Sequence, residues 1–169
     1  MKKGTIRILS LVCILVLAAC AAAPAFAEKA ELRSTQAFLD YLDGKGIKYK
    51  NVTRTDKYET VEVTYRLDHF DSLTCKFFFK EDNEEVGLRI WDIIKVKAST
   101  STALSTINGI NKDYKFAKFV LDESDMTIQA ELDVYIDADT CGRPVYDSMM
   151  SLFNITDTDE VAPKLKSLE

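Results

Sequence analysis

The first candidate for chemistry is His69, the only histidine of the sequence. A general base must reach a nucleophile or a substrate proton, and no serine or cysteine nucleophile pattern surrounds this residue. His69 falls in a turn between two predicted strands, where a solvated position is the simpler interpretation. The sequence therefore predicts no catalytic residue and no enzymatic activity.

A second candidate is the acidic segment 137–142, with the sequence DADTCG. It resembles the first half of a calcium loop, because Asp137 and Asp139 alternate along the chain and a glycine follows. The second half fails, since position twelve is Ser148 instead of a glutamate and the preceding element is a predicted strand. A plain strand-to-helix turn is the preferred interpretation, so the sequence predicts no metal ion and no cofactor.

Cys75 and Cys141 are the cysteines that lie outside the N-terminal apolar segment. An oxidising exterior would permit them to pair. Cys75 instead alternates inward on its predicted strand, which favours a buried and inert thiol. Both alternatives stay open, whereas a redox Cys-x-x-Cys pair and a zinc site are excluded by the spacing and by the numbers of cysteine and histidine residues.

Asn108 and Asn111 lie three residues apart on one face of a predicted helix, among apolar residues. Buried amides need hydrogen-bond partners, and the simpler interpretation is that they bind strand or loop backbone and fix the helix against the sheet. The alternative is a small-ligand sensor module, in which Asn108 and Asn111 line a pocket between this helix and the sheet.

The elements that position these residues follow one order along the chain. Helical spacing predicts helices at 34–46, 99–113 and 144–153, and a short one from Pro163. Alternating apolar and polar residues predict strands at 48–54, 60–67, 73–80, 86–96, 115–121 and 126–137. The order helix, strands, helix, strand hairpin, helix predicts an α+β domain with an antiparallel sheet that helices cover on one face.

The N-terminal segment has the pattern of a secretory signal peptide. Lys2, Lys3 and Arg7 are followed by an apolar stretch of about 12 residues and then by small residues. A spanning helix needs roughly 20 apolar residues, so a permanent transmembrane helix is disfavoured. We therefore expect an exported protein, extracellular or in the cell envelope.

Two processing sites compete in this leader. The sequence AFA at 25–27 suits a general signal peptidase, which would remove 1–27 and release a single domain at 28–169. The sequence LAAC at 17–20 resembles the lipobox of bacterial lipoproteins, which would remove 1–19 and leave a lipidated Cys20 as the first residue. The several acyl chains of a mature lipoprotein would anchor the protein firmly to a membrane. This anchor at Cys20 is the only membrane contact that the sequence predicts.

The charge balance argues against a nucleic-acid partner. The 169-residue chain carries a net charge of −5, and removal of the three basic residues of the leader takes this to about −8. Phosphate binding needs a basic surface, which this composition does not provide. The sequence also shows no Walker loop and no glycine-rich dinucleotide turn, which argues against nucleotide-dependent catalysis.

The segment INGIN at 107–111, together with Phe116, Phe119, the turn at 122–125 and Pro163, resembles the YbjN family, bacterial proteins grouped as sensory transduction regulators. The resemblance covers roughly 34–168. It implies the type III secretion chaperone-like fold, relatives that act by binding proteins and often as dimers, and no known active site. The export expected here departs from a cytoplasmic signalling or chaperone role.

The preferred candidate for a partner-binding site is formed by Phe78, Trp91 and Ile93. All three are large apolar residues at strand positions predicted to face water. One interpretation is that a protein partner or a second copy of the chain covers them. The other is that the strand register differs and a helix covers them. The leading expectation is thus an exported, non-enzymatic, protein-binding domain, for which both a dimer and a lipid anchor at Cys20 stay open.

Overall fold

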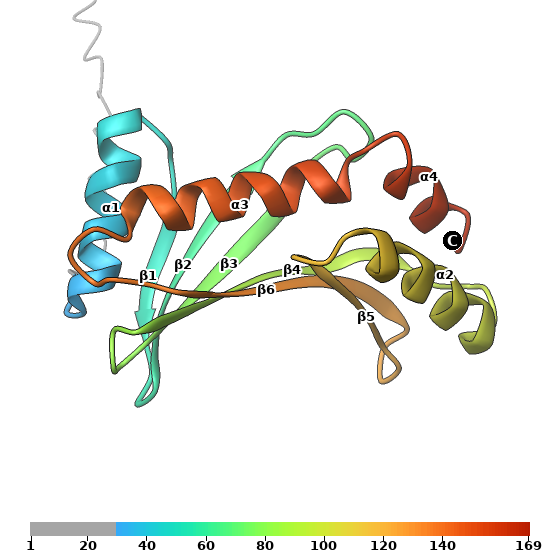
Figure 1. Cartoon of the computed structure of the whole chain (residues 1–169), viewed down its shortest axis with the longest axis horizontal. Coiled ribbons are helices and arrows are strands. Elements are labelled where there is room, and N and C mark those ends of the chain that lie inside the picture. The colour runs from blue at the N-terminus through green and yellow to red at the C-terminus, as the bar shows by residue number, and fades with distance from the viewer. Residues whose placement is uncertain (1–29) are drawn as a thin grey trace, which may run out of the picture.

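A six-stranded antiparallel sheet carries the fold, and helices cover one of its faces (Figure 1). The computed structural model describes residues 30–169, without the side chain of Asn51. Its elements are α1 (Arg33–Lys45), β1 (Lys50–Arg54), β2 (Tyr58–Tyr65), β3 (Leu73–Lys80), β4 (Glu85–Lys95), α2 (Thr100–Asp113), β5 (Lys118–Asp122), β6 (Thr127–Tyr135), α3 (Gly142–Thr156) and α4 (Val161–Lys166). The α+β class predicted from the pattern is confirmed. The predictions on the signal peptide and Cys20 lie outside the described residues.

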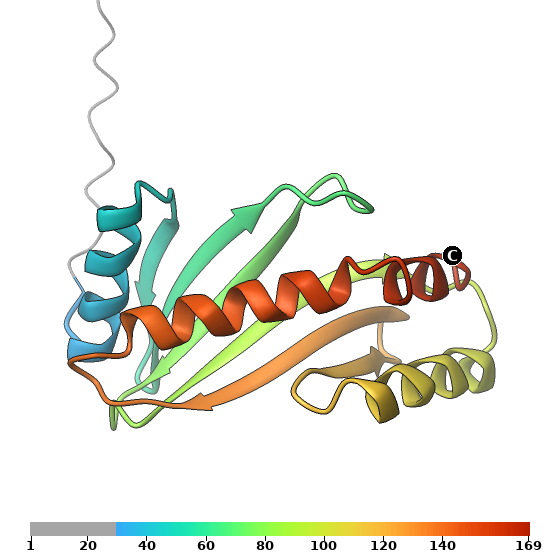
Figure 2. The ribbon, with the colours of Figure 1, turned by 45° about the horizontal axis from the view of Figure 1, so that its top comes forward.

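The strand order is β1-β2-β3-β4-β6-β5, and every neighbouring pair is antiparallel. The chain leaves β4, forms α2, and returns as the edge strand β5 before β6 enters between β4 and β5. Figure 2 shows α3 running across the strands, with α2 and α4 together at one end of the sheet. The C-terminus is held there because the Leu168 carbonyl accepts hydrogen bonds from the amides of Lys97 and Ala98.

The core lies between the inner face of the sheet and the helices α1 and α3. Phe38 of α1 packs on Phe77 and Phe79 of β3, with ring centroids 4.6 and 5.6 Å away. All three rings are fully buried. Burial of such large apolar side chains is the main favourable term in folding, so this cluster anchors α1 to the sheet.

The start of α1 differs from the expectation. The predicted helix begins at residue 34, whereas α1 begins at Arg33 and its N-cap is Leu32, which has no capping side chain. The carboxylate of Glu59, a buried residue of β2, instead accepts hydrogen bonds from the amides of Glu31 and Leu32 at 2.7 and 3.1 Å. Within the first turn of α1, the Ser34 amide donates to the Asn83 side-chain oxygen at 3.1 Å. Both acceptors are distant in the chain, whereas helix-end signals in a sequence are local.

A bulge in β4 lies beside Trp91. Asp92 has a positive φ of 51°, and β4 advances from Ile90 to Ile94 while β6 moves only from Ala130 to Ile128. Extra residues in one strand break the alternation of its side chains between the two faces. Ile93 and Ile94 are therefore both buried although they are adjacent.

Within residues 30–169, no helix has the length and the hydrophobicity needed to span a bilayer.

Candidate partner-binding face

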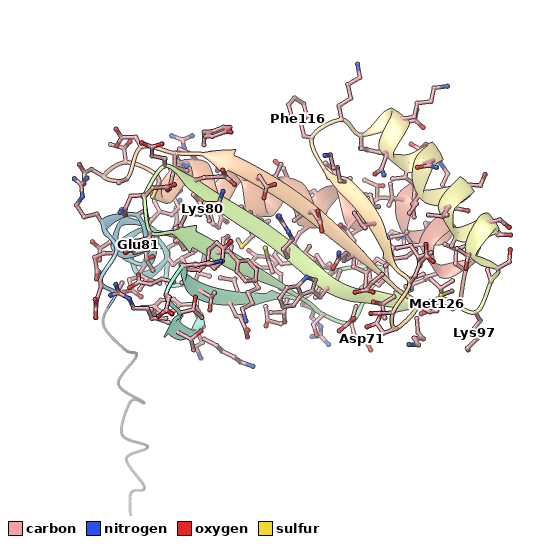
Figure 3. All side chains as sticks on the ribbon, turned by 90° about the horizontal axis from the view of Figure 1, so that it is seen from below. Asp71, Lys80, Glu81, Lys97, Phe116 and Met126 are labelled. Atoms are coloured by element: carbon pink, nitrogen blue, oxygen red, sulfur yellow. The ribbon has the colours of Figure 1, made fainter. Side chains whose placement is uncertain are left out.

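Three aromatic side chains gather on the face of the sheet that the helices leave open. Tyr58 of β2 meets Phe78 of β3 edge to face at 5.9 Å, and Phe78 meets Trp91 of β4 at 5.6 Å between ring centroids. Trp91 is 46% exposed and Phe78 is half-buried. We call these three residues the aromatic cluster. Figure 3 views the molecule from this open side, with α3 behind the strands.

Strand alternation explains why these rings point outward. Phe77 and Phe79 are fully buried on the inner face, so Phe78 between them must project to the other side. Trp91 likewise follows the buried Ile90. The expectation that Phe78 and Trp91 lie on the open face is borne out by these positions.

A hollow beside the cluster has Gly87 among its lining residues. Gly87 lies directly between Phe78 of β3 and Asp133 of β6 in the register of the sheet. The hollow has a volume of about 410 Å³, and its lining residues are Tyr58, Phe78, Lys80, Glu85, Gly87, Arg89, Trp91 and Asp133. The Asp133 and Arg89 side chains lie over this glycine, since a Cβ at Gly87 would be 3.1 Å from Asp133 Oδ1 and 3.4 Å from an Arg89 nitrogen. The missing side chain thus makes room for this ion pair. We call this depression the Gly87 hollow.

Paired charges surround the aromatic cluster. The Arg89 guanidinium lies 2.8 Å from an Asp133 carboxylate oxygen, and the Lys80 ammonium lies 2.8 Å from Glu85. The hydrogen bond to Glu85 raises the pKa of the Lys80 ammonium above its ordinary value. An apolar centre within a rim of charged and polar groups is the usual composition of a protein-binding surface.

The ammonium of Lys76 lies over two rings of the cluster. Its Nζ is 5.7 Å from the centre of the Phe78 ring and 5.6 Å from that of Trp91. A cation in this position is attracted by the negative faces of the rings. Lys76 also pairs with Glu62 at 3.5 Å, so its ammonium contacts both a carboxylate and the rings of the cluster.

Ile93 does not belong to this face, and its prediction as a partner-binding residue is wrong. Its side chain is only 6% exposed and belongs to the hydrophobic core. The cause is the bulge at Asp92, which turns Ile93 away from the face that carries Trp91. The sequence contains no glycine or proline at 91–93 that would have signalled this bulge.

The two asparagines of α2 do not form a common site. Asn111 uses its whole amide on the backbone of Phe119 in β5, and Asn108 is exposed. The main hollows of the described surface are lined by other elements. The interpretation of Asn111 as a residue that fixes the helix to a strand is confirmed, and the proposed ligand site at Asn108 and Asn111 is not formed.

His69 is half-buried between two aspartates, so the expected solvated position is wrong. Its Nδ1 is 3.5 Å from the Asp157 carboxylate and its Nε2 is 3.2 Å from Asp159. Asp157 also accepts hydrogen bonds from the backbone amides of Asp68 and His69. These contacts join the β2–β3 loop to the end of α3, so they give His69 a structural role.

The segment 137–142 is a strand-to-helix turn, as preferred. The Asp137 carboxylate accepts hydrogen bonds from the amides of Asp139 and Thr140, and Asp139 pairs with Arg33 at 3.0 Å. The bonds to Asp137 all end on its Oδ1 and are those of a side chain that closes a turn on its own backbone. In the part of the chain that the structure describes, no three acidic, histidine or cysteine residues gather as a metal site.

Cys75 and Cys141 are free and buried. Burial raises the pKa of both thiols, that of Cys141 to about 11. The Cys141 thiol donates a hydrogen bond to the Ser34 carbonyl at 3.2 Å. The structure therefore contains two separate buried thiols and not the alternative, a disulfide between Cys75 and Cys141.

Sequence reasoning missed Tyr58, Gly87 and the pair of Arg89 with Asp133. Gly87 within a long alternating strand was an available signal. Tyr58 lay before the predicted start of its strand, and the ion pair joins strands that are far apart in the chain.

Comparisons of the chain with models of protein families, with curated proteins and with solved structures gave no match.

Proposed function

We propose that this chain is an exported, non-enzymatic binding protein that holds a protein partner on the open face of its sheet. The observation that carries the proposal is the aromatic cluster of Tyr58, Phe78 and Trp91 beside the Gly87 hollow. Aromatic residues and arginine are enriched at the centres of protein interfaces, where a few of them supply most of the binding energy.

The arrangement of charges supports a protein partner over a small polar ligand. The lining of the Gly87 hollow contains two cations, Lys80 and Arg89, and two carboxylates, Glu85 and Asp133, so it has no excess charge of one sign to attract a small ion. The partly exposed rings of the aromatic cluster gain most from a broad apolar surface that removes them from water. A second copy of the chain or another protein can supply this surface.

Export and membership of the YbjN family form part of the same proposal. The leader with its alternative sites at 25–27 and Cys20 supports delivery outside the cytoplasm, with or without a lipid anchor. The motif at 107–111 supports the family, whose members bind proteins. The small-ligand sensor is not carried forward, because Asn111 already has both of its amide partners in Phe119.

The test uses the fact that Trp91 is the only tryptophan of the sequence. Its fluorescence therefore reports on the open face alone. A photo-crosslinking residue is placed at Trp91 in one variant and at Leu104 of α2, which is also exposed, in the control. We expect discrete crosslinked species from position 91, either with a second copy or with another protein of the source cell, and none from position 104.

Phe78→Ala supplies the matching loss of function, because it removes a ring of the cluster and retains the Trp91 reporter. Phe116→Ala is the control, since Phe116 is an exposed aromatic residue outside the cluster. The blue shift of Trp91 emission that accompanies partner binding should be lost in the first variant only. Equal crosslinking at 91 and 104, or no crosslink at 91, would refute the proposal.

A further inference from the structure

Half of the outer edge of β6 has no neighbouring strand. β6 pairs with β4 from Thr127 to Tyr135, but β5 covers only the part of it from Thr127 to Glu131. The first paired residue of β5, Lys118, lies opposite Glu131. The backbone from Leu132 to Tyr135 is therefore an open sheet edge on the side away from β4.

The backbone groups of successive β6 residues point alternately toward β4 and toward the open edge. The Ile136 amide donates to the Glu84 carbonyl at 2.9 Å, so the residue after β6 points its backbone groups toward β4. In an antiparallel pair the residues alternate in this direction. The amides and carbonyls of Asp133 and Tyr135 thus point away from β4, toward the open edge.

An apolar groove accompanies this edge, between β6 and α3. Its volume is about 680 Å³, and half-buried Leu132 and Val134 of β6 face Ile155 of α3 across it. Phe116 and Tyr135, which border it, are 83% and 86% exposed. They are two of the four large apolar side chains that are exposed among the described residues. Figure 3 shows Phe116 projecting from this margin of the sheet.

We propose that the open edge of β6 binds an extended peptide segment that alternates apolar and basic residues and adds to the sheet as a further antiparallel strand. Unpaired backbone groups beside a groove for every second side chain are what recognition by strand addition requires. The apolar residues of the peptide enter the groove beside Val134, and the intervening residues lie on the open face beside Asp133.

The charges at the edge identify basic residues as the ones that face Asp133. Among the nearest outward-facing positions of β6, Glu131 has Lys118 as its cross-strand partner, whereas Asp133 has no paired strand residue on that side and only borders a hollow with Lys115 and Phe116. Asp133 and Glu131 share one guanidinium, that of Arg89, at 2.8 and 3.8 Å. A lysine or arginine opposite Asp133 would repeat the pair of Lys118 with Glu131.

The same charges argue against a second copy as the occupant. The two charged residues that line the groove, Asp133 and Asp147, are both acidic, although Arg143 contacts Asp147 at 3.4 Å. Edge-to-edge pairing of two copies would bring both aspartates of each copy to one interface. Like charges in neighbouring strands are destabilising, so a basic peptide fits this edge better.

The experiment titrates the purified protein with a fluorescein-labelled octapeptide of alternating valine and lysine, capped at both ends. The control peptide alternates valine and glutamate. We expect the valine-lysine peptide to bind about tenfold or more tightly than the control, a difference of about 1.4 kcal/mol. Amide exchange measured by NMR should slow at Asp133 and Tyr135 when the peptide is bound. The Val134 amide, which already faces β4, should not change.

Variants of Tyr135 separate backbone pairing from side-chain contact. Tyr135→Pro removes an amide that points to the open edge and is not used by β4, so the sheet keeps its other bonds. It should weaken peptide binding about tenfold relative to Tyr135→Thr, which keeps the amide. Phe78→Ala should leave peptide binding unchanged, so failure of this proposal is distinct from failure of the proposed function.

Three results would overturn the proposal. The first is equal binding of the two peptides, and the second is a bound peptide that does not protect the amides of Asp133 and Tyr135. The third is a dimer in light scattering that Tyr135→Pro dissociates, because the occupant of the edge would then be a second copy of the chain.

Discussion

Asn111 of α2 imitates a neighbouring strand at the outer edge of β5. Its Nδ2 donates to the Phe119 carbonyl at 2.9 Å, and its Oδ1 accepts from the Phe119 amide at 2.7 Å. β5 is the edge strand of the sheet, so these bonds satisfy backbone groups that no strand can reach. The same sheet margin is thus closed by α2 along β5 and open along the last residues of β6.

Asn111→Ala should lower the free energy of unfolding by about 1–3 kcal/mol, because it leaves the half-buried amide and carbonyl of Phe119 without partners. Asn108→Ala, one turn earlier on the exposed side of α2, should stay within about 0.5 kcal/mol of the parent protein. Urea unfolding of both variants measures the difference. Equal losses in the two would contradict the strand-imitating role of Asn111.

Glu59→Gln should destabilise the protein by about 1.5–3 kcal/mol. The charged carboxylate accepts two backbone hydrogen bonds at the start of α1, and bonds to charged groups are the stronger kind. Glu62→Gln is the control, since Glu62 lies on the same strand but forms only a partly exposed ion pair with Lys76. Thermal unfolding should show a lower midpoint for Glu59→Gln than for Glu62→Gln.

Gly142→Ala should destabilise the protein by about 1–3 kcal/mol, because α1 and α3 meet at this residue. A Cβ at Gly142 would lie 2.6 Å from the Ala37 carbonyl oxygen and 2.7 Å from the Tyr41 Cβ. Gly109→Ala provides the opposite case: no atom lies within 4 Å of its added Cβ. Gly109 lies inside α2, where alanine is the better helix former, so this variant should gain about 0.5–1 kcal/mol.

The buried thiols should make the protein less stable at alkaline pH. Burial raises the pKa of Cys141 from its ordinary value of 9.0 to about 11, and it raises that of Cys75 as well. Above pH 9 the unfolded chain loses these thiol protons while the folded protein retains them, so the free energy of unfolding falls as the pH rises toward 11.

Cys141→Ala should show a smaller loss of stability than the parent protein between pH 9 and pH 11. Denaturant unfolding at a series of pH values measures the free energy of unfolding of both proteins. Subtracting one pH dependence from the other removes the contribution of the lysine and tyrosine residues that both proteins share. Parallel curves for the two proteins would show that the Cys141 thiol titrates normally in the folded state.

The intact mass of the exported protein should correspond to a processed chain. A soluble product would begin at Glu28, and a lipoprotein would begin at Cys20 with the added mass of its acyl chains. Cys20→Ser should leave the first product unchanged and abolish the second. A mass that includes residues 1–19 would contradict both predicted cleavage sites.

Most of the secondary structure was predictable because its signals are local. The strand 73–80 is found as β3 with the same bounds, and the helix at 99–113 is found as α2 with Ser99 as its N-cap. Alternating residues placed Phe78 on the open face correctly. The boundaries of α3 were predicted too narrowly, because residues 154–156 continue the helix by packing onto the core, as buried Thr156 shows.

The sequence alone determined the order of the elements and the class of the fold, since periodicity follows directly from backbone geometry. For Phe78 and Trp91 it left two strand registers open, and the structure contains the one that turns them to the open face. Only the tertiary structure decided that Ile93 is buried, that Glu59 and Asn83 bind backbone amides around the start of α1, and that β6 extends beyond β5 to leave an open edge. Each of these depends on the register between segments that are distant in the chain. Register is set by packing and hydrogen bonds across the whole sheet, and no local pattern of residues encodes it.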